Sequence, residues 1–124
     1  MTKEDYNNKI IDDAVEVLEN DGVIIVPTDT VYGLAVSSNS SVAIEKIYEI
    51  KKRNIDKRLP MVVDTYKRLA SLCEVKEEQL KRLKKYYPGK LTLVLKKKNS
   101  ADTVAVRMIN SEIINKIIDR LDCP

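Results

Sequence analysis

The sequence of 124 residues contains no histidine, phenylalanine or tryptophan. Without histidine, Ser-His and Cys-His nucleophile pairs and histidine-based metal sites are excluded. Any chemistry must use Lys, Arg, Asp, Glu, Ser, Thr, Tyr or backbone groups, which is a poor inventory for hydrolysis. It is adequate for stabilising phosphate charge, which needs positioned cations and hydrogen-bond donors. The composition therefore favours phosphoryl or nucleotidyl chemistry.

Long hydrophobic runs and cysteines are also scarce. No apolar run approaches the roughly 20 residues of a membrane span, and the first residues are acidic and polar, unlike a signal peptide. The two cysteines, Cys73 and Cys123, lack CxxC spacing, so we expect both to be reduced and Cys73 to be buried. We expect a cytoplasmic protein that does not associate with membranes.

The chain contains 44% apolar and 33% charged residues, as a globular protein does. Its length fits one domain, 1–124, with a modest core of Ile, Leu, Val and Tyr. Helical spacing predicts helices over 9–19, after Ser40 or Ser41, after Asp64, around 80–87 and after Ser111. Short apolar runs predict strands at 23–26, 34–36, 61–63, 91–95 and 103–107. This mixture indicates an α/β fold, a mixed sheet with helices packed on it.

The segment PTDTVYG, residues 27–33, lies between two predicted strands. It concentrates four side chains that can form hydrogen bonds, namely Thr28, Asp29, Thr30 and Tyr32. Loops at strand ends commonly carry ligands. A tight turn is the alternative, with Pro27 fixing its φ and Gly33 supplying a left-handed conformation.

The end of the second predicted helix and the residues after it carry five cations within eight residues: Lys51, Lys52, Arg53, Lys57 and Arg58. If that helix ends near Arg53, Lys51 and Arg53 can point towards one anion and bind a nucleotide triphosphate. The alternative is a solvated basic helix end.

Arg107 ends a predicted strand, and Thr103 lies four residues earlier on the same face. A guanidinium there could clamp a carboxylate or form a surface ion pair. The lysine-rich runs 81–85 and 96–98 are interpreted as solvated faces or as a surface that contacts RNA.

Taken in order, four segments resemble the motifs of the Sua5/YrdC/YciO family: PTDTVYGL at 27–34, Lys51-x-Arg53, PGKLT at 88–92 and VAVR at 104–107. Lys90 stands where the family has proline in PGPLT, and Met108 follows VAVR in place of the usual proline. The resemblance implies a YrdC/RibB-like twisted open sheet around a large concave pocket.

The resemblance also implies a function, that of L-threonylcarbamoyladenylate synthase, a nucleotidyltransferase. Such an enzyme forms threonylcarbamoyl-AMP and pyrophosphate from L-threonine, bicarbonate and ATP with Mg²⁺, and uses no tightly bound prosthetic group. No residue of this sequence is assigned as a metal ligand. The product serves modification of adenosine 37 in tRNA by a downstream threonylcarbamoyl transferase. By motif position, Thr30, Tyr32 and Arg107 hold threonine, while Lys51, Arg53, Lys57 and Thr103 face ATP. Lys51 and Arg53 are the expected catalytic cations.

The family pattern continues after its last helix with a strand and an S-x-N motif that helps to bind ATP. The sequence stops at Pro124, before that position, so we expect a domain that is incomplete at its C-terminus. Three alternatives stay open: a module that binds double-stranded RNA or tRNA, a truncated inactive paralogue, and a carbamoyl-transferring relative of hydrogenase-maturation proteins.

Overall fold

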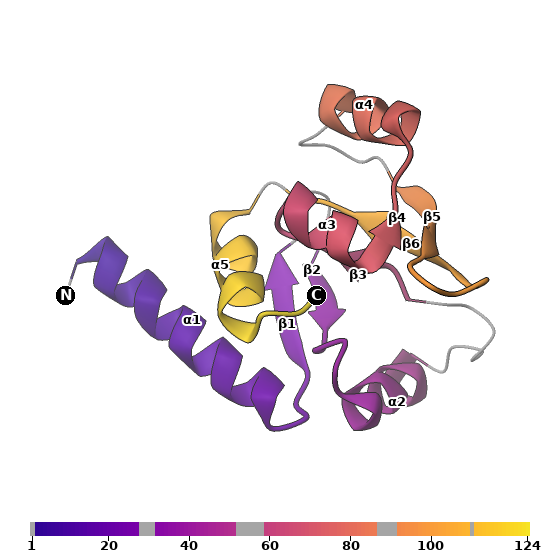
Figure 1. The fold of residues 1–124 in the computed structure, drawn as a ribbon. Coiled ribbons are helices and arrows are strands. Elements are labelled where there is room, and N and C mark those ends of the chain that lie inside the picture. Colours follow the sequence, from indigo (N-terminus) through magenta and orange to yellow (C-terminus); the bar gives the residue numbers. More distant parts are fainter. Residues whose placement is uncertain (1, 28–31, 52–58, 87–91, 110) are drawn as a thin grey trace.

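The computed structural model describes residues 2–27, 32–51, 59–86, 92–109 and 111–124 (Figure 1). Within these ranges the helices are α1 (Lys3–Glu19), α2 (Ser41–Lys51), α3 (Tyr66–Leu72), α4 (Glu77–Tyr86) and α5 (Glu112–Leu121). The strands are β1 (Ile24–Pro27), β2 (Tyr32–Ala35), β3 (Met61–Val62), β4 (Cys73–Glu74), β5 (Leu93–Lys97) and β6 (Thr103–Arg107). No helix in these ranges is long and apolar enough to cross a bilayer.

The described strands form two sheets. β1 and β2 are an antiparallel pair in which Pro27 lies opposite Tyr32. The second sheet has the order β3-β6-β5-β4, and β3 runs parallel to β6 while the other neighbours are antiparallel. The predicted α/β class with a mixed sheet is confirmed. The two-residue strand β4 was not predicted, because so short a run has no readable period.

Three hydrophobic clusters hold the layers together. The largest lies on one face of the four-stranded sheet and joins Leu69 of α3 and Leu83 of α4 to Leu95 of β5 and Val106 of β6. A second packs α1 against α5, side by side in Figure 1. A third packs α5 against Val26 of β1 and Val62 of β3, which lie in different sheets. α5 therefore contacts both sheets.

Both cysteines are buried and free of disulfides, as expected for Cys73. Cys73 is 1% exposed within the largest cluster. Burial raises the pKa of its thiol, and the nearby charge of Lys97 opposes that effect. A protonated thiol in a core is a packing group rather than a nucleophile.

α1 begins at Lys3, earlier than the predicted residue 9. The reason is a capping box, in which the Thr2 hydroxyl accepts from the Asp5 amide (3.1 Å) and the Asp5 carboxylate accepts from the Thr2 amide (3.3 Å). At the other end the Gly22 amide donates to the Val17 carbonyl, 2.9 Å away. A Cβ on Gly22 would lie 2.4 Å from Val17 Cγ1, so close approach requires glycine here.

Positive φ falls on residues other than glycine in the described ranges. Asp21, with a φ of 60°, makes the turn after α1. Gly33 has no positive φ and lies within β2, so the left-handed conformation considered for it is wrong. Gly33 pairs with Val26 in the antiparallel ladder, so its backbone has the extended conformation of a strand.

The remaining helix starts follow local side-chain caps. Ser40 accepts from the Ala43 amide (3.0 Å) and Ser111 from the Ile114 amide (3.2 Å), which confirms both predicted starts. α3 differs from the prediction, because Thr65 rather than Asp64 caps it through the Arg68 amide (3.1 Å). The Asp64 carboxylate accepts from the Arg68 side chain instead.

Neighbouring residues of β5 test the assignment of the two sheet faces. Leu95 is 1% exposed and Val94 is 64% exposed. We expect Leu95→Ala to lower the free energy of unfolding by about 2–5 kcal/mol, since it leaves a cavity in the core. Val94→Ala should cost no more than about 0.5 kcal/mol. Urea denaturation followed by circular dichroism measures both, and equal losses would contradict the assignment.

Candidate ligand-binding face of the sheet

The side chains of β5 and β6 alternate between two faces of the four-stranded sheet. Val104 and Val106 point into the largest cluster, so Thr103, Ala105 and Arg107 point to the opposite side. Across the ladder, Lys96 lies opposite Thr103 and Val94 lies opposite Ala105. We call this second surface the site face, defined by Val94, Lys96, Thr103, Ala105 and Arg107.

The site face has an apolar middle and a cation towards each end. Thr103 and Val94 are exposed and Arg107 is partly buried. Thr103 and Arg107 are four residues apart, or roughly 14 Å at the rise of an antiparallel strand. Lys96, beside Thr103, has its Nζ 3.5 Å from Oε2 of Glu74, which lies opposite it on β4. The arrangement suits a ligand with two separated anionic groups.

The predicted site residues are only partly covered by the described ranges. Thr103 and Arg107 share one face, as predicted. Lys51 is the exposed last residue of α2, and Tyr32, 75% exposed, begins β2. Thr30, Arg53 and Lys57 lie outside the described residues. The convergence of Lys51 with Arg53, and of Thr30 with Arg107, therefore stays a prediction.

Sequence reasoning missed the position of Lys96. Residues 96–98 were interpreted as one solvated run, but β5 alternates, so Lys96 and Lys97 point to opposite faces. Lys97 lies opposite Cys73 in the ladder, and Cys73 belongs to the largest cluster, so Lys97 is on the core side of β5. The sequence signal was the alternation along the strand: Leu93, Leu95 and Lys97 share one face, and Lys96 therefore points to the other.

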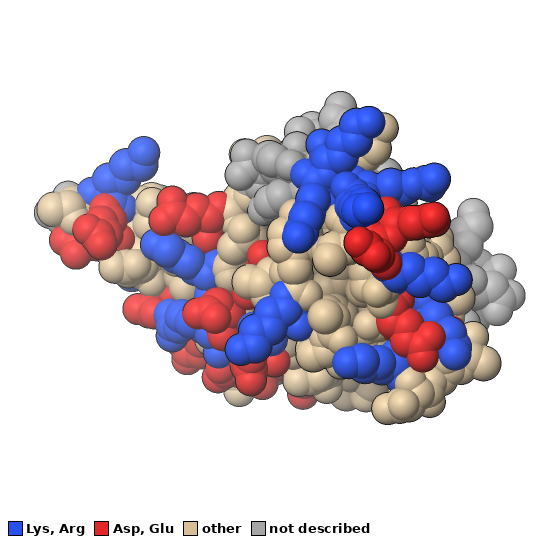
Figure 2. All heavy atoms as spheres, turned by 45° about the horizontal axis from the view of Figure 1, so that its top comes forward, with Lys and Arg blue, Asp and Glu red and all other residues tan. Residues whose placement is uncertain are grey.

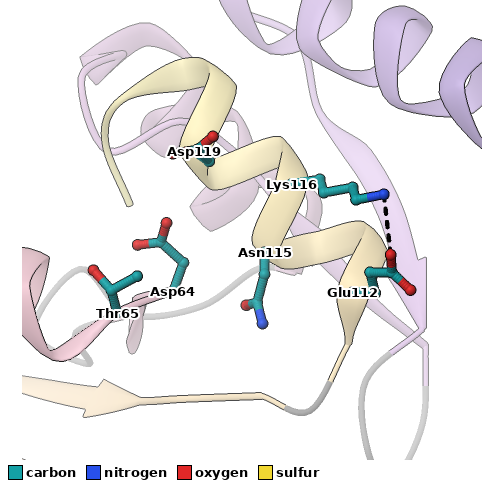
Figure 3. A pocket seen from close by; sticks show the side chains of 6 residues that line it. All are labelled: Asp64, Thr65, Glu112, Asn115, Lys116 and Asp119. Atoms are coloured by element: carbon teal, nitrogen blue, oxygen red, sulfur yellow. Dashed lines mark ion pairs between the residues drawn. The ribbon is translucent and has the colours of Figure 1, made fainter.

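One cavity, of about 430 Å³, lies between α5 and the segment that joins β3 to α3 (Figure 3). It is lined by Asp64, Thr65, Glu112, Asn115, Lys116 and Asp119. Lys116 Nζ is 3.0 Å from Glu112 Oε1, so the one lysine of the lining is paired with a carboxylate. The Asp, Glu and Cys residues of the described ranges form no group able to hold a metal ion. This acidic lining does not supply the cations that a phosphate ligand needs.

A second cavity, of about 340 Å³, lies near the last residues, between α3 and Ser38 and Asn39. Arg68 lines it and is held by two carboxylates: Nε lies 2.7 Å from Asp64 Oδ1 and Nη1 lies 3.1 Å from Asp122 Oδ1. The hydrogen bond that Arg68 donates to Asp64 raises the pKa of Arg68 despite the opposing effect of burial. Arg68 thus joins α3 to the end of α5 and is committed to a structural role.

The chain was compared with known proteins. The Sua5/YciO/YrdC family model, described as “Telomere recombination”, matches residues 16–124. The threonylcarbamoyl-AMP synthase of Pyrococcus abyssi is 36% identical over 111 residues, which are 82% of this chain and 33% of that protein. That of Bacillus subtilis is 36% identical over 112 residues, 82% of this chain and 32% of the relative. Pyrococcus abyssi Sua5, solved in complex with L-threonine, superposes with a TM-score of 0.83 at 34% identity, covering 92% of this chain and 36% of that one.

These matches define a class of α/β proteins with a curled mixed sheet, and the chain belongs to the Sua5/YciO/YrdC family. The chain spans about a third of the length of these relatives. The matched region includes α2, β5 and β6, so Lys51 and the whole site face lie within the family domain.

The Arg68 bridge yields a stability prediction. Arg68→Met should lower the free energy of unfolding by about 1.5–3 kcal/mol, because it leaves the Asp64 carboxylate, whose side chain is 5% exposed, without its charged partner. Arg82→Met, on the exposed side of α4, is the control and should change it by about 0.5 kcal/mol or less. Thermal and urea denaturation measure both, and a harmless Arg68→Met would show that the bridge is dispensable.

Proposed function

We infer that this chain carries the substrate-binding part of an L-threonylcarbamoyladenylate synthase, a nucleotidyltransferase of tRNA modification. The observation that carries this proposal is the shared face of Thr103 and Arg107 in a chain of this family. Relatives from two organisms have the name threonylcarbamoyl-AMP synthase, and one solved relative binds L-threonine.

Amino acid recognition is assigned to Arg107, Thr30 and Tyr32. A guanidinium offers two parallel N–H donors that match a carboxylate, so Arg107 suits the carboxylate of threonine. Its partly buried position at the end of β6 strengthens such a contact, since charge-assisted hydrogen bonds gain strength away from water. Thr30 and Tyr32 then contact the rest of the amino acid.

The reaction begins on the amine of threonine. Its nitrogen attacks the carbon of bicarbonate, and loss of water leaves a carbamate. A carbamate oxygen then attacks the α-phosphorus of ATP, the bond from that phosphorus to the bridging oxygen breaks, and pyrophosphate leaves with its electron pair. Negative charge builds on the phosphates in this step, so positioned cations lower the barrier.

Nucleotide recognition is assigned to Lys51, Arg53, Lys57 and Thr103. Lys51 and Arg53 stabilise charge on the α-phosphate and the departing pyrophosphate, and Mg²⁺ enters as part of the ATP substrate. The sequence lacks histidine, so the proton lost by the threonine amine passes to another acceptor. The product passes to a downstream tRNA threonylcarbamoyl transferase.

A second candidate function, binding of double-stranded RNA or tRNA, is favoured by one surface. α4 carries four cations, Lys81, Arg82, Lys84 and Lys85, and basic side chains gather at the top of Figure 2, where Figure 1 places this helix. RNA binding through this surface would occur without ATP or threonine and weaken steeply with salt. Fluorescence anisotropy with labelled RNA at two salt concentrations tests it.

The deciding experiment measures pyrophosphate release by the purified chain with ATP, threonine and bicarbonate. Release that requires all three, together with threonylcarbamoyl-AMP detected by mass spectrometry, supports the synthase. We expect Arg53→Ala to lower the rate at least about a hundredfold, the order expected from losing one donor to the transition state. Lys52→Ala, which removes an equal charge at the variable position of the K-x-R motif, is the control. An unchanged rate in Arg53→Ala would remove that residue from the mechanism.

Binding of threonine gives a separate measurement. Arg107→Ala should weaken threonine binding by about tenfold or more, because a charge-assisted pair contributes about 1.5–3 kcal/mol. Arg120→Ala is the matched control, since Arg120 is exposed on α5 and paired with Asp12. Isothermal titration calorimetry gives both dissociation constants. Equal constants for the two variants would contradict the assignment of Arg107.

A further inference from the structure

Lys96 lies where the proposed nucleotide site would extend along the sheet. Its partner across the β5–β6 ladder is Thr103, so their side chains emerge side by side on the site face. Directly opposed residues of an antiparallel pair have Cβ atoms about 4.5–5.5 Å apart. A ligand that reaches Thr103 on this face therefore comes within range of a lysine side chain.

We propose that Lys96 binds the polyphosphate tail of the nucleotide beside Thr103. This inference rests on the proposed function, and it adds a residue that none of the sequence motifs includes. An ammonium group is a compact charge with three donors, which suits phosphate oxygens approaching from several directions.

The ion pair of Lys96 with Glu74 leaves the lysine available to a ligand. Nζ and Oε2 are 3.5 Å apart, and the two side chains are 50% and 53% exposed. Exposed pairs of this kind contribute only about 0–1 kcal/mol to stability. The protein therefore loses little stability when Nζ of Lys96 leaves the Glu74 carboxylate and binds a group with more negative charge. Glu74 meanwhile keeps the ammonium near the surface of β4 and β5 when no ligand is bound.

The two ends of the site face favour different anions. Arg107 has the planar donor pair that matches a carboxylate, and Lys96 has the point charge that matches phosphate. They stand at opposite ends of a surface roughly 14 Å long, with Val94 and Ala105 between them. This order places the amino acid near Arg107 and the phosphates near Lys96.

Lys97 provides a control that differs from Lys96 almost only in direction. It is the next residue, is also exposed and carries the same charge, but it points to the core side of β5 beside Cys73. Lys96→Ala and Lys97→Ala therefore change the net charge equally. A difference in ATP affinity between the two variants therefore depends on which face of the sheet the lysine occupies, and not on the net charge of the protein.

The test is calorimetric titration of the full chain with Mg²⁺-ATP, AMP and threonine. Lys96→Ala should weaken ATP binding about fivefold to tenfold, a loss of about 1–1.4 kcal/mol. It should change AMP and threonine binding less than about twofold, and Lys97→Ala should change ATP binding by less than about twofold, within ordinary surface effects. Lys96→Arg should restore most of the ATP affinity.

Three results would overturn the inference. They are equal losses of ATP affinity in Lys96→Ala and Lys97→Ala, equal losses for ATP and AMP, and unchanged ATP binding in Lys96→Ala. Glu74→Gln covers the case in which Lys96→Ala fails to fold. It releases Lys96 and removes a nearby carboxylate, so ATP should bind about twofold tighter, and weaker binding would count against the inference. If the unchanged chain binds neither ATP nor threonine, the proposed function itself fails, which is a distinguishable outcome.

Discussion

The antiparallel pairing of β5 with β6 determines both the core and the candidate site. Leu93 lies opposite Val106 and Lys96 opposite Thr103. A slip of one residue would exchange the two faces of a strand, because side chains alternate along it. The burial of Leu95 and Val106 in the largest cluster therefore also fixes the direction of Arg107. Stability and the proposed ligand recognition therefore depend on the same register, and a slip of β5 against β6 would disrupt both.

α5 supplies the second constraint, the relation between the two sheets. Its buried residues Ile114 and Ile118 contact Val26 of β1 and Val62 of β3. β3 runs beside β6, the strand that ends in Arg107, while β1 pairs with β2, the strand that begins with Tyr32. The distance between these two parts of the proposed threonine site is thus set by apolar packing against one helix. Because protein cores are close-packed, we expect changes of side-chain volume in this cluster to alter that distance.

Sequence reasoning succeeded where the signal is local. Alternating side chains predict the strand 103–107, and the structure confirms it. The hydroxyl of Ser111 predicts a helix cap, which the structure also confirms. It failed where tertiary contacts decide. Asp64 and Thr65 can both cap a helix, and the choice followed from Arg68, which binds Asp64. For the candidate site, the shared face of Thr103 and Arg107 was predictable, whereas the place of Lys96 required the pairing partner of β5.

The chain covers only part of the relatives it matches, so substrate binding and catalytic rate are considered separately. The contacts proposed for the site face are ones that a carboxylate and a phosphate would make before reaction, and such contacts determine affinity. The rate depends instead on groups aimed at charge that develops only in the transition state. The chain covers about a third of the Pyrococcus abyssi and Bacillus subtilis relatives, so binding and rate are separate questions for it. For this reason affinity for threonine and ATP, rather than rate alone, is the proper measure of what β5 and β6 contribute.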